Sequence, residues 1–271
     1  MRLEFFLVIL LSSLGLDAQN CNLYPENSPC RKACLILESA NKYPQGSKQS
    51  MELCTKATSL CPELASAWHS LSVPYLKRGD YYNWRKYLDK AVALDPKTYL
   101  GYRGACLFEF LHDYESALSD FKKLDLKKSG HLGFNPNGEY NLRIQKGLCY
   151  RELGKVDQAI SEIKMGIDEG KAEGGVGTYD YLHLAVCYMS KNQVDSATHY
   201  MELQLPQYPN FPDTHYYLGL CALGHGDKIK AKTYFEKAKM LYPQNHRKDP
   251  YVIMPDQIFL SDIEKQLRSL N

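Results

Sequence analysis

Proline recurs with a period of 34 residues, and this period limits the possible folds more than any other feature of the chain. Pro62 is followed by Pro96, and Pro209 by Pro243, at this spacing. The last unit, YYLGLCALGHGDKIKAKTYFEKAKMLYP, has apolar residues at helical spacing on both sides of a Gly-His-Gly turn. A proline ends its second half, as expected where a helix stops. Each unit is therefore predicted to be a pair of helices joined by a tight turn.

Most of the predicted pairs carry one small residue on either side of the turn. Two helices that pack as a hairpin need small side chains where their backbones come closest, and a twelve-residue gap across the turn puts one on each helix. Three units have this gap and a fourth is one residue wider: Gly147 and Ala159, Ala185 and Ala197, Gly219 and Ala231, then Gly104 and Ala117. Two earlier copies are less regular, and the first of them is degenerate.

A helix-turn-helix period of 34 residues is the signature of the tetratricopeptide repeat. The chain resembles this family from about Arg31 to Pro243, in six copies. The resemblance implies an all-α fold, a right-handed superhelix (α-solenoid) of about six helix-turn-helix repeats whose ends need caps. The predicted capping helix has one apolar face and a candidate N-cap at Asp256; the face consists of Ile258, Leu260, Ile263 and Leu267. The predicted domains are a signal peptide (1–18), an N-terminal segment (19–30), the repeat domain (31–243) and a C-terminal extension with the capping helix (244–271).

The N-terminal sequence MRLEFFLVILLSSLGLDAQN predicts export. Its apolar run from Phe5 to Leu11 is too short to span a bilayer and has the length of a signal-peptide core. Ala18 offers a small residue for cleavage before Gln19. The mature protein is then expected to be periplasmic or secreted, where disulfides persist. A lipid anchor at Cys21 is an alternative, although Asn20 is an unfavourable residue before a lipidated cysteine.

The nine cysteines form two groups. Four occupy one repeated position, two residues after the small contact residue, and face away from the hairpin partner: Cys106, Cys149, Cys187 and Cys221. Because equivalent helices of stacked repeats lie about 8–10 Å or more apart, these four are predicted to pack as thiols. The other five crowd the least regular repeat. One or two disulfides would staple this end repeat, with buried thiols as the alternative; the candidates are Cys30, Cys34, Cys54 and Cys61.

The sequence carries no recognisable catalytic or cofactor motif. The nucleophile elbow G-x-S-x-G, the P-loop and the zinc motif H-E-x-x-H are all missing. His183 and Cys187 share a helix face at metal-ligand spacing, but no further ligand has matching spacing, so no metal site is predicted. Lys and Arg number 33 against 31 Asp and Glu, which leaves no basic field for nucleic acid. The chain is therefore predicted to be neither an enzyme nor a cofactor-binding protein.

The predicted function is that of a scaffold for protein–protein interaction. In the resembled family the first helices of the repeats line a concave groove that receives a peptide or partner segment. The residue after each small contact position is turned by about 100° toward this groove, and the residue three further on shares the same wall. This predicted strip is mostly apolar, which is typical of a contact site: Val73, Leu76, Ala105, Phe108, Leu148, Arg151, Val186, Met189, Leu220 and Leu223. The alternative is that the C-terminal helix or the superhelix itself covers the strip.

Sequence alone leaves other functions open. The family's clamp for a C-terminal carboxylate uses recurrent lysines and asparagines, but no asparagine directly follows the small contact residues. A regulatory or structural subunit of an envelope complex, lipidated at Cys21, is one alternative. An enzyme with a site near His131 or His183 is another, without a catalytic set to support it. Trp84 stands where later copies have alanine, and is either a packed ring or an aromatic binding platform.

Overall fold

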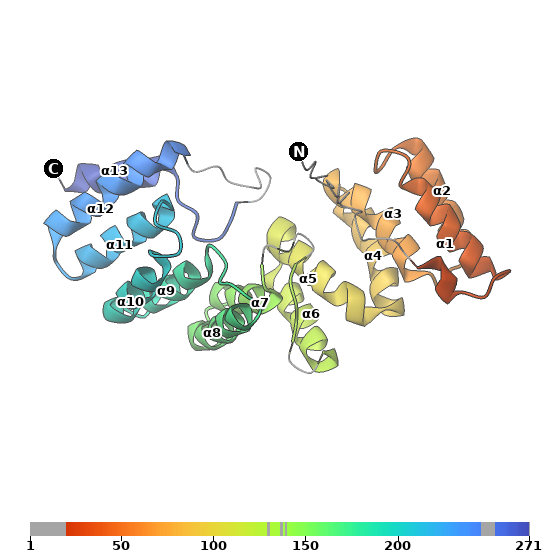
Figure 1. The fold of residues 1–271 in the computed structure, drawn as a ribbon, viewed down its shortest axis with the longest axis horizontal. Coiled ribbons are helices and arrows are strands. Elements are labelled where there is room, and N and C mark those ends of the chain that lie inside the picture. Colours follow the sequence, from red (N-terminus) through yellow and green to blue (C-terminus); the bar gives the residue numbers. More distant parts are fainter. Residues whose placement is uncertain (1–19, 129–130, 136–137, 139, 245–252, 271) are drawn as a thin grey trace, which may run out of the picture. The chain divides into compact units, whose positions relative to one another are not determined.

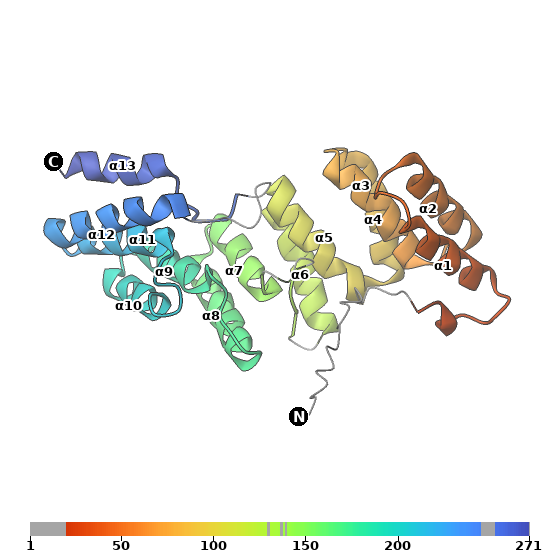
Figure 2. The ribbon, with the colours of Figure 1, turned by 45° about the horizontal axis from the view of Figure 1, so that its top comes forward.

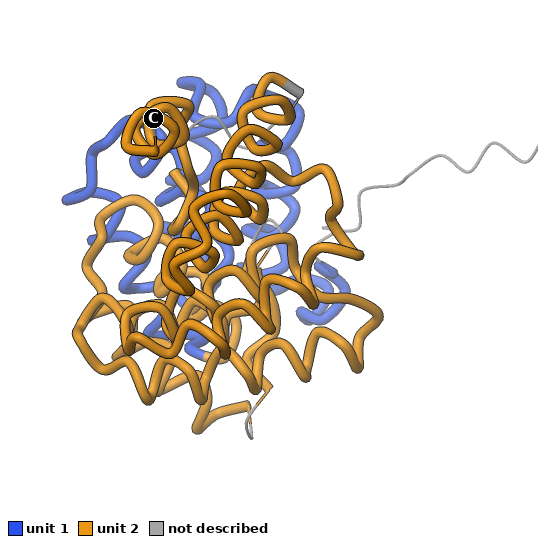
Figure 3. The backbone as a smooth tube through the Cα atoms, turned by 90° about the vertical axis from the view of Figure 1, so that its left-hand side faces the viewer, with its two compact units in different colours: residues 1–96 blue, residues 97–271 orange. Residues whose placement is uncertain are grey.

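Helices form the regular structure of the described residues, and one isolated β-bridge joins Phe134 to Asn141. The computed structural model describes residues 20–128, 131–135, 138, 140–244 and 253–270 (Figure 1). The chain divides into two units, residues 1–96 and 97–271, which Figure 3 draws in different colours. The predicted signal peptide lies outside the described residues. None of the helices described here has both the length and the apolar composition needed to cross a membrane.

Unit 1 contains the first two helix pairs. After a short 3-10 helix, η1 (Cys21–Leu23), α1 (Pro29–Ala40) packs against α2 (Lys48–Leu60), and α3 (Ala65–Lys77) packs against α4 (Tyr81–Leu94). Contacts between α2 and α3 stack one pair on the other. Trp84 on α4 is 0% exposed, so the ring is a packing residue and the alternative of an aromatic platform is excluded.

Unit 2 contains four further pairs and a final helix. The pairs are α5 (Pro96–Leu111) with α6 (Tyr114–Lys127), α7 (Leu142–Glu152) with α8 (Val156–Ala172), α9 (Asp180–Ser190) with α10 (Val194–Gln204), and α11 (Pro212–Gly224) with α12 (Lys228–Leu241). A second 3-10 helix, η2 (Tyr242–Gln244), follows α12, and α13 (Leu260–Ser269) packs against α12 (Figure 2). The prediction of an all-α protein built from six repeated helix pairs and a capping helix is confirmed.

Short turns join the two helices of each pair. Gly154 and Gly226 adopt φ angles of +73° and +79° in such turns, a backbone conformation that glycine takes without steric cost. In three pairs the second helix begins after an aspartate whose carboxylate accepts the backbone N–H three residues further on; these are Asp80, Asp113 and Asp227. Local sequence therefore determines where each pair turns.

Glycines allow the two helices of a pair to approach closely. A Cβ atom on Gly147 would lie 2.6 Å from Cγ1 of Ile163 and 3.1 Å from the backbone oxygen of Ala159. A Cβ atom on Gly219 would lie 2.6 Å from the ring of Phe235. Such distances leave no room for a side chain, so the predicted role of small residues at the hairpin contact is confirmed.

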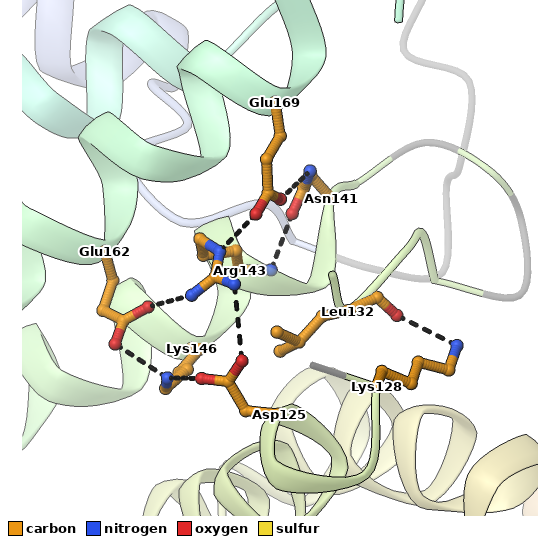
Figure 4. Close-up of polar contacts among 8 residues, drawn as sticks. All are labelled: Asp125, Lys128, Leu132, Asn141, Arg143, Lys146, Glu162 and Glu169. Carbon is orange, nitrogen blue, oxygen red and sulfur yellow. Dashed lines mark hydrogen bonds and ion pairs between the residues drawn. The ribbon is translucent and has the colours of Figure 1, made fainter. Parts of the chain in front are cut away.

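A buried cluster of charges fixes α7 between α6 and α8 (Figure 4). Arg143 and Lys146 on α7 each have a side chain that is only 6% exposed. Arg143 pairs with Glu169 on α8 at 2.6 Å and with Glu162 at 3.0 Å. Lys146 pairs with Asp125 on α6 at 2.6 Å and with Glu162 at 2.7 Å. Buried cations require such partners, and these come from neighbouring helices, so the cluster acts in packing.

Two disulfides link the first repeat. Cys30 is bonded to Cys61, and Cys34 is bonded to Cys21, because η1 packs back onto α1. Cys54, which the sequence offered as a further candidate, is a buried thiol. The four cysteines of the repeated position are also buried thiols, which confirms that they do not bond to one another: Cys106, Cys149, Cys187 and Cys221.

Candidate functional site

The residues of the predicted binding strip lie on α3 in unit 1 and on α5, α7, α9 and α11 in unit 2. We call the surface formed by these four helices of unit 2 the first-helix face. Several strip positions are core rather than the open surface expected from sequence, because neighbouring helices enclose them: Leu76, Ala105, Phe108 and Leu148. The remaining positions are half-buried: Val73, Arg151, Val186, Met189, Leu220 and Leu223.

The chain's own C-terminal region covers part of the first-helix face. Residues 253–259, which we call the tail segment, lead into α13 and are drawn as the blue coil before that helix in Figure 1. Within it, Ile258 is only 2% exposed. Ile258 belongs to an apolar cluster against which Leu220 and Leu223 of α11 pack. The sequence left the C-terminal helix or the superhelix itself as the alternative to an open groove, whereas the covering residues are the non-helical segment that precedes this helix.

The start of α13 differs from the prediction. Asp262 accepts a hydrogen bond from the backbone N–H of Phe259 at 2.7 Å, within the first turn of the helix. Asp256 does not cap this helix, since its carboxylate is directed to α7 and α9 instead. Of the predicted apolar face, Ile258 and Ile263 are buried, whereas Leu260 is exposed.

Asp256 is the polar anchor of the tail segment. Its Oδ2 accepts a hydrogen bond from Nδ1 of His183 on α9 and pairs with Nη1 of Arg151 on α7, both at 2.6 Å. The His183 side chain is 0% exposed, and those of Asp256 and Arg151 are 10% and 12% exposed. Because a carboxylate can only accept, Nδ1 carries a hydrogen, and the hydroxyl of Tyr140 lies 3.3 Å from Nε2 of the same ring. These groups join α7, α9 and the tail segment.

Two further contacts on α11 are made with the backbone of the tail segment. The hydroxyl of Tyr217 donates to the carbonyl oxygen of Asp256 at 3.1 Å. The N–H of Ile258 donates to Oδ1 of Asp213 at 3.0 Å, and Asp213 is 0% exposed. Since main-chain groups are common to every polypeptide, these two hydrogen bonds do not depend on the side chains of the segment that α11 holds.

Asp256 is kept ionised although it is buried. Burial alone would raise the pKa of Asp256, but the hydrogen bond from His183 and the charge of Arg151 hold that pKa below its ordinary value. Burial also acts to lower the pKa of Arg151, yet Asp256 raises it above its ordinary value. The ion pair therefore persists throughout the neutral range.

We expect the stabilising effect of Asp256 to disappear in acid. Because its pKa is lower in the folded chain than in the unfolded chain, ionised Asp256 contributes stability above about pH 4. This contribution is lost as the pH falls through the lower, folded pKa. Asp256→Asn should therefore reduce the free energy of unfolding by about 2 kcal/mol at neutral pH, and by progressively less below about pH 4. Urea denaturation at a series of pH values measures the difference, and a deficit that does not change with pH would exclude the charge as its cause.

A cavity of about 390 Å³ lies beside the N-terminal end of the tail segment. Phe108, Tyr114 and Tyr140 give it aromatic walls, Arg151 and Glu152 line the α7 side, and residues 253–256 close it. Its volume is within the usual range of ligand pockets. The cavity therefore leaves part of the first-helix face accessible next to the tail segment.

The site has an acid–histidine pair but no activated nucleophile. Burial raises the pKa of the Cys187 thiol to about 11, so it is protonated at neutral pH. His131, the other predicted candidate for catalysis, is exposed and pairs with Glu173 at 3.1 Å. Two groups with three possible metal ligands occur among the described residues, and both contain a disulfide whose sulfurs are bonded to each other. The arrangement of these described side chains is thus suited to binding.

The repeat pattern does not predict Asp256, Asp213 or Tyr217 as site residues. Asp256 belongs to the stretch IMPDQIFL, which lies outside the 34-residue period. The stretch has one isolated acid among apolar residues. This pattern fits a helix-capping residue as well as it fits a residue of a binding site. Asp213 follows a proline at the start of α11. An acid is common at this position because the helix dipole favours a negative charge near the N-terminus.

Two parts of the chain match family models of the tetratricopeptide repeat, at residues 65–98 and 212–245. These matches correspond to the second helix pair, α3 with α4, and the sixth, α11 with α12. No curated protein sequence is significantly similar to the chain.

The fold is similar to several solved structures. PilW, described as a widely conserved type IV pilus biogenesis factor, is 16% identical with a TM-score of 0.60, over 79% of this chain and 96% of PilW. PilF of Pseudomonas aeruginosa is 18% identical with a TM-score of 0.60, over 80% of this chain and 95% of PilF. YrrB, described as a TPR protein with an unusual peptide-binding site, is 18% identical with a TM-score of 0.55, over 72% of this chain and 95% of YrrB. At such low identity the likeness shows the fold alone.

Proposed function

Because the chain belongs to the tetratricopeptide-repeat family, we propose that it is an exported scaffold that binds a segment of a partner protein on the first-helix face of unit 2. One observation carries this proposal. A non-helical segment of polypeptide already lies on this face, held by one buried carboxylate and by two hydrogen bonds to its backbone. A face with these groups can bind another segment in the same way. The adjacent cavity, lined by Phe108 and Tyr114, offers additional contact area to a longer segment.

The disulfides of unit 1 support the export part of the proposal. Both hold the first helix pair, near the apolar N-terminal run in sequence, and disulfides persist mainly in oxidising compartments. Since the sulfur of Cys21 is bonded to Cys34, it is not available for a thioether-linked lipid. We therefore favour an exported protein without a lipid anchor over the lipoprotein alternative.

We expect the mature protein to begin at Gln19. Signal-peptide cleavage after Ala18 would leave this residue at the N-terminus, two positions before the first disulfide cysteine. Intact-mass analysis and N-terminal peptide mapping of protein purified from the source cell measure this directly. Retention of Met1, or a lipid mass on Cys21, would contradict the expectation.

Site-specific photocrosslinking tests where the partner binds. A photoreactive amino acid at His112, an exposed residue that lines the cavity, should give a crosslinked product of defined mass in the source cell. The matched control is position Leu126 on α6, which is 87% exposed but lies on a second helix of the same unit. Products of equal yield at both positions, or only at position 126, would contradict the proposed use of the first-helix face.

A further inference from the structure

We infer that the partner segment carries an aspartate or glutamate followed two positions later by an aliphatic residue, and that it binds by exchange with the tail segment. This inference rests on the proposed function and specifies the chemistry of its ligand. The exchanging groups are the carboxylate of Asp256 and the side chain of Ile258, which are the buried anchors of the tail segment.

The requirement for a carboxylate follows from the groups that surround Asp256. Arg151 and His183 both direct a donor at Oδ2 of this residue, and both side chains are almost wholly enclosed. Removing Asp256 without a substitute would leave the guanidinium with Glu152 as its remaining ion-pair partner and would take away the acceptor of Nδ1. Because Arg151 would lose one of its two carboxylate partners and His183 its acceptor, a segment that displaces the tail binds more tightly when it supplies a carboxylate of its own.

The requirement for an aliphatic residue follows from the second anchor. Ile258 is enclosed in an apolar cluster with Tyr216, Ala222 and Phe235, and its N–H is bound by Asp213. A polar side chain at this place would enter the cluster without a compensating partner, which is unfavourable. The backbone hydrogen bonds from Tyr217 and to Asp213 hold the two anchors at a separation of two residues.

The tail segment is enclosed at its two anchors and exposed at its ends. Ile253 and Phe259, at its ends, are 67% and 43% exposed, whereas the two anchors are enclosed. Asp256 lies in a turn closed by the hydrogen bond from the Gln257 N–H to the carbonyl oxygen of Met254 at 3.1 Å, and its φ angle of +62° is unfavourable for a residue with a side chain.

Exchange need not disturb the end of the fold. α13 is attached to α12 independently of Asp256, through the buried side chain of Ile263 and the ion pair of Lys239 with Glu264 at 3.1 Å. A partner segment also has room to extend past the tail, since the cavity beside residues 253–256 borders Phe108 and Tyr114. The tail segment can therefore leave while unit 2 keeps its helix pairs and its capping helix.

Binding of a synthetic peptide in trans tests the exchange. The probe is fluorescently labelled IMPDQIFL, the sequence of residues 253–260, and its matched control is the same peptide with asparagine in place of aspartate. Full-length Asp256→Ala protein should bind the probe at least about tenfold more tightly than wild type, because its own tail has lost one anchor. The asparagine peptide should bind that variant at least about tenfold more weakly than the probe. Adding Arg151→Ala to the variant should remove the preference for aspartate.

A thermal measurement keeps the test informative if the affinity is low. Asp256→Ala should melt below wild type, and excess probe, but not the asparagine peptide, should raise its melting temperature. If Asp256→Ala does not fold, Asp256→Asn, which keeps the shape of the side chain, replaces it in both assays. Equal binding of the two peptides would overturn the carboxylate requirement. If the substituted protein, Asp256→Ala or Asp256→Asn, bound the probe no more tightly than wild type, exchange would be overturned. Dimerisation of wild type through its own tail would assign the site to a second copy instead. The crosslink at position 112 is independent of these results and tests the proposed function separately.

Discussion

Replacing Arg143 by methionine lowers the free energy of unfolding of unit 2 by about 3–5 kcal/mol. The substitution keeps the unbranched, apolar part of the side chain but removes the cation that pairs with Glu162, Glu169 and Asp125. Lys146 still pairs with Asp125 and Glu162, whereas Glu169 loses its ion pair and keeps the hydrogen bond from Asn141. Because these carboxylates lose hydrogen bonds as well as charge compensation, the loss exceeds that of a surface ion pair.

Urea denaturation followed by circular dichroism measures this effect. Arg268→Met on α13 is the matched control, since its side chain is 72% exposed and it forms only an i,i+4 pair with Glu264 at 4.0 Å. The control should change the free energy of unfolding by less than about 1 kcal/mol. A loss of similar size in both variants would contradict the structural role given to the buried cluster.

Removing the Cys30–Cys61 disulfide should destabilise unit 1 by about 3–4 kcal/mol. The bond closes a loop of sequence separation 31 across the two open ends of the first hairpin. The double substitution Cys30→Ala and Cys61→Ala removes the bond without placing a hydroxyl in the buried position of Cys61. The expected cost arises mainly from the greater conformational freedom of the unfolded chain.

The control for this prediction is Cys54→Ala, which alters a buried thiol of the same hairpin but breaks no bond. Denaturation of wild type with and without reductant provides a second comparison, and reductant should have no effect on the double variant beyond that on the Cys21–Cys34 bond. If the double variant is as stable as Cys54→Ala, the disulfide does not stabilise the end repeat.

The repeat architecture could be predicted from sequence because its determinants are local and periodic. Gly147 with Ala159, and Gly219 with Ala231, recur at one spacing, and the structure places Gly147 against the backbone of Ala159 and Gly219 against the ring of Phe235. The cysteines of the repeated position share that period and have one environment, a buried one. Patterns of this kind are visible in one sequence because each copy repeats the same physical requirement.

The site was less predictable because its decisive contacts are neither local nor periodic. Asp256 and Arg151 are separated by 105 positions, and no spacing rule relates a residue of the tail segment to one inside a repeat. The apolar strip was correctly placed on the first helices, but sequence could not show that Leu148 is enclosed or that Ile258 packs near Leu220. The partner of Cys34 escaped prediction for the same reason, since Cys21 lies before the first repeat.

Hydrogen–deuterium exchange with a selected peptide is the most direct test of the first-helix face as a binding surface. Peptides enriched on the full-length protein from a random display library would be added in excess, and exchange would be followed by mass spectrometry. The account predicts slower exchange in α7, α9 and α11, and faster exchange in the tail segment, where the Ile258 N–H loses its bond to Asp213. Protection confined to the second helices α6, α8, α10 and α12, or to unit 1, would contradict it.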